Sequence, residues 1–172
     1  GYFNSNGDIS SSTASGAVSS TVNGDVGGLL GYANGSGSLS DSSANGNVSA
    51  PTGANSVGGL VGEFRLSGGA VNSNAGASGS TVAGGSYTGG LIGYYNVATA
   101  FTSGNYSGDS VSGNANAGGL IGYMNQGSIA PASQLTVAAH VTGTGNVGGA
   151  IGRSIGSVTN LRATGNVTGA AG

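Results

Sequence analysis

The stretch VGGLLGY, Val26–Tyr32, decides the fold, because close copies of it return along the whole chain. These copies are VGGLVGE from Val57, TGGLIGY from Thr88, AGGLIGY from Ala117 and VGGAIGR from Val147. The second glycines of the five copies are 31, 31, 29 and 30 residues apart. A period of this length is typical of solenoids and other stacked arrays, in which each repeat contacts mainly its neighbours. We therefore expect residues 1–172 to form a single repeat array.

Each repeat carries two further apolar positions between successive copies of GGLxG. One is occupied by Ile9, Leu39, Val71, Phe101, Ile129 and Val158, and the other by Val18, Val48, Val82, Val111, Val141 and Val167. Short polar stretches separate these positions, and four of them contain the dipeptides Asn6-Gly7, Asn23-Gly24, Asn34-Gly35 and Asn45-Gly46. Asparagine and glycine tolerate the positive φ of tight turns, so we expect corners there.

These patterns predict an all-β protein. Short β-branched clusters recur, glycine interrupts every longer window, and no apolar stripe of helical period persists. We expect a right-handed parallel β-solenoid with a roughly triangular section. Each rung, meaning one circuit of the solenoid, would hold about 30 residues and three short strands, with five to six rungs in all. Equivalent apolar residues of successive rungs would then stack into ladders that form a narrow core.

The GGLxG motif holds two adjacent apolar columns, which cannot both face inward on a regular strand because successive side chains point to opposite faces. The first column is Leu29, Leu60, Leu91 and Leu120, and the second is Leu30, Val61, Ile92 and Ile121. In one interpretation, the flanking glycines let the backbone bend so that both columns reach the core. In the other, the leucine column forms an outward apolar stripe through which solenoids pair laterally.

Both ends of the chain lack the features of a capping repeat. Gly1-Tyr2 matches the last two residues of the motif, so the sequence opens within a repeat. We expect an array that is uncapped at both ends. It would be part of a longer array, or a subunit that stacks axially on copies of itself through its terminal strands.

Composition argues against several classes of function. Charged residues are 5% of the chain, the formal net charge is −2, and the cations are three arginines without any lysine. Three cations can neutralise only a few phosphates of a nucleic acid. We therefore expect no nucleic-acid partner. No apolar run is long enough to span a membrane. The chain has no cysteine, and its five carboxylates are scattered, so we expect no metal and no cofactor.

Two short motifs suggest catalysis or nucleotide binding, but their surroundings do not fit. Gly152–Gly156 matches the G-x-S-x-G pattern of hydrolases, yet no acidic residue follows it and His140, the only histidine, precedes it. Gly143–Gly148 matches G-x-G-x-x-G but lacks a following helix and a later acidic residue. His140 has no second metal-ligand type nearby. We expect no catalytic, metal-binding or cofactor-binding residues, and no enzyme.

The position that follows GGLxG is the most informative one for the surface. Stacking would place its residues in one column along the array: Tyr2, Tyr32, Glu63, Tyr94, Tyr123 and Arg153. In one interpretation the tyrosines only cover a corner of the solenoid. In the other, Tyr2, Tyr32, Tyr94 and Tyr123 form an aromatic strip that contacts a glycan or another partner, because tyrosine offers a large contact area at a low entropic cost.

The GGL[VI]G core with its following small or polar turn and G-x-V strand resembles the GLUG repeat of large secreted or surface-attached bacterial proteins, including adhesins. The resemblance spans nearly the whole chain and is weakest at Gly148–Gly152, where alanine replaces the leucine. It implies a β-solenoid in an extracellular stalk or adhesive region, and it brings no catalytic residues.

The sequence suggests three functions to weigh against one another. The first is a passive stalk or adhesive segment of an extracellular or cell-surface protein. The second is a subunit of a self-assembling extracellular fibre built by axial stacking of rungs. The third, ice binding, would need regular outward threonine ladders, and the threonines do not recur at one phase of the repeat. The first function is the one that the sequence favours.

Overall fold

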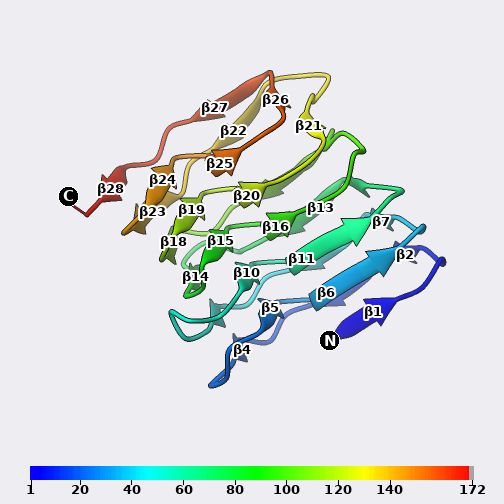
Figure 1. Cartoon of the computed structure of the whole chain (residues 1–172), viewed down its shortest axis with the longest axis horizontal. Helices are drawn as coiled ribbons and strands as arrows, with labels where there is room; N and C mark the ends of the chain where they lie inside the picture. The colour runs from blue at the N-terminus through cyan, green and yellow to red at the C-terminus, as the bar shows by residue number, and fades with distance from the viewer. Residues whose placement is uncertain (171–172) are drawn as a thin grey trace.

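The protein is all-β: a parallel β-solenoid of about six rungs with roughly 30 residues per rung, as seen in a computed structural model. The structure describes residues 1–170, apart from the side chain of Val71, and contains no helix within that range. Successive rungs stack from the blue N-terminal rung to the red C-terminal rung, and the two termini lie at opposite ends of the stack (Figure 1). The expectation of a stacked repeat array of parallel strands is confirmed.

One of the two six-stranded sheets contains the position that follows GGLxG and takes one strand from each rung. We call it the tyrosine sheet. All its neighbouring strands pair in parallel, and in spatial order they are β1 (Tyr2–Asn4), β6 (Leu30–Gly35), β11 (Val61–Leu66), β16 (Ile92–Tyr95), β20 (Ile121–Met124) and β25 (Ile151–Ser154).

Two further sheets precede the tyrosine sheet along each rung. The valine sheet consists of β4 (Val18–Ser19), β9 (Val48–Ser49), β14 (Thr81–Ala83), β18 (Ser110–Gly113), β23 (His140–Gly143) and β28 (Val167–Gly169). The glycine sheet, which ends in the first glycine of GGLxG, consists of β5 (Asp25–Gly27), β10 (Ser56–Gly58), β15 (Tyr87–Gly89), β19 (Asn116–Gly118) and β24 (Asn146–Gly148).

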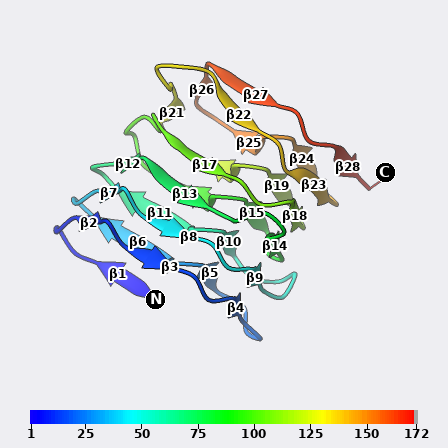
Figure 2. The ribbon, with the colours of Figure 1, turned by 180° about the vertical axis from the view of Figure 1, so that it is seen from behind.

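The rest of the rung holds two more short strands, visible from behind in Figure 2, except that in the fourth rung the first of them is reduced to a single bridge between Phe101 and Ile129. The first position is taken by β2 (Ile9–Ser10), β7 (Leu39–Ser40), β12 (Ala70–Val71), β21 (Ser128–Ile129) and β26 (Ser157–Val158). The second is taken by β3 (Thr13–Ala14), β8 (Ser43–Ala44), β13 (Ser73–Ala75), β17 (Gly104–Tyr106), β22 (Leu135–Val137) and β27 (Leu161–Ala163).

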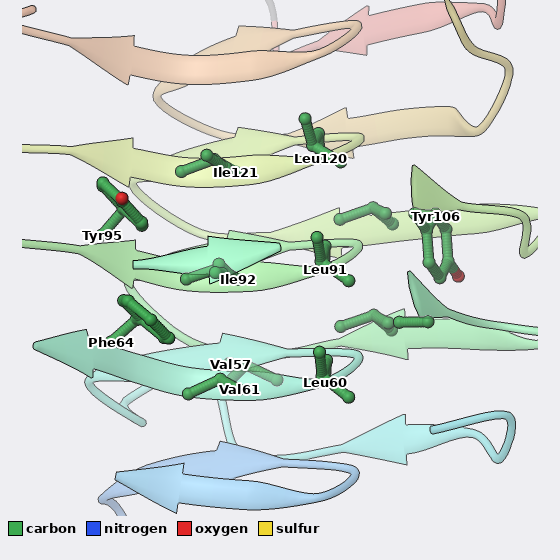
Figure 3. Close-up of a cluster of buried hydrophobic side chains, with 14 of the residues drawn as sticks. Val57, Leu60, Val61, Phe64, Leu91, Ile92, Tyr95, Tyr106, Leu120 and Ile121 are labelled. Atoms are coloured by element: carbon green, nitrogen blue, oxygen red, sulfur yellow. The ribbon is translucent and has the colours of Figure 1, made fainter. Parts of the chain in front are cut away.

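The core consists of the predicted ladders. On the tyrosine sheet, Val61 lies in register with Leu30 and Ile92, and Ile121 with Ile92 and Ile151. The valine ladder is in register over all six rungs. Figure 3 shows Val61, Ile92 and Ile121 above one another, with Phe64 and Tyr95 beside them; all five side chains are fully buried. Burial of these side chains is the main source of stability.

The leucine column of GGLxG lies in this core and does not form an outer stripe. Leu60, Leu91 and Leu120 are fully buried, and Leu29 in the second rung is half-buried. The N–H groups of Leu60 and Val61 both donate to the carbonyl oxygen of Leu91, at 2.9 and 3.1 Å. On a straight strand, successive N–H groups point to opposite sides, so the chain bends at this point. The bend brings both apolar columns inside, and lateral pairing through the leucines is excluded.

Glycine is required beside this bend because two sheets meet backbone to backbone. A Cβ on Gly58 would lie 2.0 Å from the carbonyl oxygen of Val61. A Cβ on Gly62 would lie 2.5 Å from the carbonyl oxygen of Gly31 and 2.9 Å from that of Ser56 in the glycine sheet. No side chain fits between the tyrosine and glycine sheets, which explains why GGLxG keeps its glycines.

Three details differ from the sequence prediction. A rung holds five short strands and not three, because the polar segments between the apolar positions also pair with their neighbours. The sequence predicted that Val71 stacks on Leu39, but Ala70 lies in register with Leu39 and Val71 with Ser40. The side chain of Val71 is outside the described part of the structure. The predicted right-handed sense stays a prediction.

The corners also differ. Of the glycines in the four Asn-Gly dipeptides, only Gly35 has a positive φ, at 133°. The non-glycine residues with positive φ are Ser11, Asp41, Asn72 and Asn160, with φ between 48° and 52°. The sharp corner of the rung therefore lies between the two short strands that follow the tyrosine sheet along the chain, for example between β7 and β8.

Candidate functional site

The six residues that follow GGLxG form one column across the tyrosine sheet. The register places Tyr2 beside Tyr32, Tyr32 beside Glu63, Glu63 beside Tyr94, Tyr94 beside Tyr123 and Tyr123 beside Arg153. The alignment that the period predicts is therefore present, and it brings Tyr2, Tyr32, Tyr94 and Tyr123 onto one face of the sheet.

The tyrosine rings in this column contact one another. Tyr2 and Tyr32 stack with their centroids 5.0 Å apart and an angle of 6° between the ring planes. Tyr94 and Tyr123 have centroids 5.4 Å apart and a tilt of 39°. Because the rings largely cover one another, their edges and hydroxyl groups are what they offer to a partner.

Tyr87 joins the column from the glycine sheet, and the sequence pattern did not reveal it. Its ring lies 5.3 Å from that of Tyr94 and 5.3 Å from that of Tyr123. The register aligns Tyr87 with Ser56 and Asn116, so no tyrosine recurs at its position. The two sheets touch through their backbones, and this contact brings Tyr87 to the column. Only the close approach of the glycine and tyrosine sheets, which a single repeat position does not reveal, could have indicated that Tyr87 belongs to this column.

We call this surface the tyrosine strip; it consists of Tyr2, Tyr32, Glu63, Tyr87, Tyr94, Tyr123 and Arg153. The chain has seven tyrosines, and the two outside the strip, Tyr95 and Tyr106, are buried in the core. Within the strip, Tyr2 is 73% exposed and Tyr123 9% exposed, with the other three tyrosines between these limits. Every tyrosine outside the core therefore lies on one face.

Four of the eight charged side chains lie in the strip or directly beside it: Glu63 and Arg153 within it, and Arg65 and Asp25 next to Glu63. Arg65 forms an ion pair with Glu63, the one ion pair between side chains of residues 1–170. The Arg65 guanidinium lies 6.0 Å from the ring centroid of Tyr94, and that of Arg153 lies 4.9 Å from that of Tyr123. Both distances are within the range of cation–π attraction. Arg65 and Arg153 thus lie at the two ends of the Tyr94–Tyr123 pair.

Two carboxyl groups near this pair hold their protons more tightly than usual. Burial raises the pKa of Asp25, opposed by hydrogen bonds with Ser56 and by the charge of Arg65. Burial also raises the pKa of Glu63; the hydrogen bond with Arg65 opposes this shift and the charge of Asp25 adds to it. Oδ1 of Asp25 is buried without a hydrogen-bond partner. Burial likewise raises the pKa of the Tyr94 hydroxyl, so this group stays a hydrogen-bond donor.

Three pairs of asparagines from neighbouring rungs lie beside the strip. Asn34 donates to Asn4 at 2.8 Å, Asn125 to Asn96 at 3.1 Å and Asn146 to Asn116 at 2.8 Å. The Tyr123 hydroxyl donates to Oδ1 of Asn125 at 2.8 Å. A side-chain amide has two N–H donors and an oxygen with two acceptor sites, so one rung-to-rung bond leaves part of its capacity free. The strip therefore combines aromatic edges with hydroxyl and amide groups.

The G-x-S-x-G motif, residues 152–156, contributes Arg153 to the strip, whereas His140 lies on the valine sheet. Ser154 donates its hydroxyl to the Gly156 carbonyl at 2.9 Å, and Nδ1 of His140 accepts from the Asn166 backbone N–H at 3.3 Å. Within residues 1–170, no three His, Cys, Asp or Glu side chains gather as a metal site would require. No segment in that range forms a helix with the length and apolarity that a membrane crossing needs.

An open groove of about 320 Å³ lies on the valine sheet, away from the strip. It is lined by small residues without charge: Ser112, Gly113, Thr142, Gly143, Thr144, Thr168, Gly169 and Ala170.

Compared with known proteins, the chain matches no family model, and no curated protein and no solved structure is significantly similar to it. The tyrosine strip must therefore be interpreted from its own geometry and chemistry.

Proposed function

We propose that the chain is a non-enzymatic repeat array of an extracellular or cell-surface protein, a stalk or adhesin-like segment that contacts its partner through the tyrosine strip. The resemblance of its motif to GLUG repeats supports the location. The observation that carries the proposal is the gathering of every non-core tyrosine on one face of a uniform stack. Stacking of the rings also stabilises the sheet, but the ring edges and hydroxyl groups stay open to a partner.

The chemistry of the strip suits a polysaccharide. Phenol and amide groups can donate to and accept from sugar hydroxyls, and the ring edges supply apolar contact. Neighbouring rungs are about 4.8 Å apart, so the aromatic and polar side chains of the column from Tyr2 to Arg153 follow one another at a constant spacing. A polymer lying along the strip would meet several of them at once, and weak contacts would add up.

Binding of the whole chain to immobilised dextran, chitin oligosaccharides, hyaluronan and heparin tests the proposal. We expect binding to at least one of these polymers, and the double variant Tyr32→Ser/Tyr94→Ser should weaken it about tenfold or more. The double variant Thr136→Ala/Thr142→Ala, which changes exposed residues of two other faces, should bind as the unchanged chain does. Circular dichroism would verify that both variants keep their β-structure.

Equal binding by the two double variants would contradict the role of the strip. Absence of binding to all four polymers would contradict a polysaccharide partner.

A second candidate is a subunit of an extracellular fibre that grows by axial stacking. All described strand pairs between neighbouring rungs are parallel and in register. A rung from a second copy, or a further rung of the same chain, could continue these ladders in the same way. Analytical ultracentrifugation at rising concentration separates the two candidates. Growing assemblies, seen as filaments by electron microscopy, would support the fibre, and a monodisperse monomer over a wide concentration range would contradict it.

A further inference from the structure

The chain offers very few side chains to an oxidant apart from its tyrosines. It contains no cysteine, no tryptophan and one methionine. That methionine, Met124, is fully buried in the core. Cysteine and methionine are the residues that oxidants usually attack first when they are accessible. One-electron oxidation of this protein is therefore directed to the phenol rings of the tyrosine strip.

Each tyrosine ring of the strip contacts at least one other tyrosine ring of the strip. Tyr2 pairs with Tyr32, and Tyr87, Tyr94 and Tyr123 form a trio in which all three centroid distances are 5.3 or 5.4 Å. The rings of the trio are tilted against one another by 28° to 57°, so one edge of each ring comes nearer to its neighbour than the centroids do. Carbon–carbon coupling requires such an approach of edges.

The two core tyrosines have no such neighbour. The ring of Tyr95 contacts Phe64 and Phe101, and the hydroxyl of Tyr106 donates to backbone carbonyls of Ser80 and Ser110. A radical on either ring would find no second phenol beside it. Coupling is therefore possible between rungs on the strip and not within the core.

We propose that the trio Tyr87, Tyr94 and Tyr123 is a site of oxidative cross-linking, at which hydrogen peroxide and a haem peroxidase join two rings as dityrosine. Each phenol loses one electron and its hydroxyl proton. The two tyrosyl radicals form a bond between the ring carbons next to their oxygens, and the hydrogens displaced from those carbons move as protons through water to the oxygens, which restores both phenols. Hydrogen peroxide takes up the two electrons and two protons and becomes two molecules of water.

Such a bond would act as a clamp between rungs. Tyr94 and Tyr123 belong to neighbouring strands of the tyrosine sheet, and their link closes a loop of 30 residues, from 94 to 123 inclusive. A solenoid is stabilised by contacts between neighbouring rungs, and a covalent link between them restricts the unfolded chain as a disulfide does. This inference concerns a modification of the strip and does not depend on which partner the strip binds.

Oxidation of dilute whole chain by peroxidase and hydrogen peroxide tests the proposal in a Tyr2→Phe background, which removes the first pair. We expect dityrosine fluorescence, a product that remains monomeric on a denaturing gel and a mass lower by two hydrogen atoms. Adding Tyr94→Phe and Tyr123→Phe should reduce the fluorescence about tenfold or more, because proximity of the rings sets the coupling rate. Phenylalanine keeps the ring stack, so the fold is preserved. Adding Tyr32→Phe instead leaves the trio intact and should change nothing.

Urea unfolding gives a second measurement. The oxidised Tyr2→Phe protein should unfold at a higher urea concentration than its unoxidised form, and the variant without Tyr94 and Tyr123 should show no such shift. Equal dityrosine yields with and without Tyr94 and Tyr123 would overturn the proposal. So would products linked only between separate chains, or a yield that does not fall when the chain is unfolded in urea before oxidation.

Discussion

At the scale of single residues, the spacing of neighbouring rungs depends on glycines, whose side chain is a single hydrogen atom. Gly59 is the second glycine of its motif copy, and a Cβ on it would lie 2.1 Å from the carbonyl oxygen of Gly90 in the next rung. That contact is far below any real separation of nonbonded atoms, and the neighbour is backbone, which cannot turn away. The period of the sequence revealed this position, and only the packing shows why glycine occupies it.

Gly59→Ala should therefore destabilise the protein by about 2 kcal/mol or more, because the rung must shift away from its neighbour. Gly16→Ala is the matched control, since nothing lies within 4 Å of the added methyl group and its φ is not positive. Urea unfolding of both variants measures the difference. If Gly59→Ala unfolded at the same urea concentration as Gly16→Ala, the close approach of the rungs would be wrong.

The carboxyl groups of Asp25 and Glu63 predict an unusual pH dependence. Their pKa values are raised in the folded protein above the ordinary values of 3.8 for aspartate and 4.5 for glutamate, so the folded state binds these protons more tightly than the unfolded state. Stability should therefore rise as the pH falls from neutral through the raised pKa values, and this gain is complete below the unfolded values. Asp8 acts in the opposite direction: its pKa is lowered by hydrogen bonds with Ser38, so its contribution is lost only below 3.8.

Urea unfolding between pH 7 and pH 4 measures this effect as a rising free energy of unfolding. The double variant Asp25→Asn/Glu63→Gln removes both titrating groups and should flatten the curve. A wild-type stability that falls steadily over the same range would contradict the assigned burial of the two carboxyl groups.

At the scale of structural elements, the corner between β7 and β8 shows what pattern reading misses. Asp41 adopts φ = 48° there, as Ser11, Asn72 and Asn160 do at the same corner of other rungs. Non-glycine residues enter this left-handed region at a cost of roughly 1–2 kcal/mol, and polar residues with short side chains tolerate it best. Three different residue types share the position, so it forms no visible motif, while the conspicuous Asn-Gly dipeptides lie mostly in gentler bends.

Substitutions of Asp41 test this corner. Asp41→Gly should leave the free energy of unfolding unchanged or raise it by at most about 1 kcal/mol, because glycine adopts positive φ without strain. Asp41→Val should lower it by about 1 kcal/mol or more, because a β-branched side chain is strongly disfavoured there. Thermal unfolding of the two variants measures the difference. Equal stabilities would show that the corner does not require the left-handed conformation.

At the scale of the whole molecule, the solenoid is a linear stack whose stability is greatest in its middle rungs. Phe64 and Tyr95 in the central rungs are fully buried, whereas Val158 and Val167 in the last described rung are 41% and 47% exposed. Each central rung is stabilised by two neighbours, so opening it breaks two interfaces, whereas an outer rung has one described neighbour.

Hydrogen exchange should therefore be graded along the stack. The amides of β11, β16 and β20 should be protected most, and those of β2 and β26 least, because outer rungs open without unfolding the rest. Mass spectrometry of deuterium uptake on the whole chain measures this gradient. Uniform protection from the first to the last rung would indicate a single cooperative unit and contradict the linear view.

The sequence by itself determined the repeat, the parallel stacking, the tyrosine and valine ladders and the column from Tyr2 to Arg153, because a constant period places equivalent residues above one another. Only the tertiary structure decided where Leu60 and Tyr87 lie. Leu60 is buried because two successive N–H groups turn toward one carbonyl, and Tyr87 joins the strip because two sheets touch without side chains between them. The period of the sequence predicts which residues of successive rungs stack on one another. It does not predict which stacks come to lie on the same face, because this depends on the shape of the rung. That shape follows from contacts between segments at different positions within the repeat.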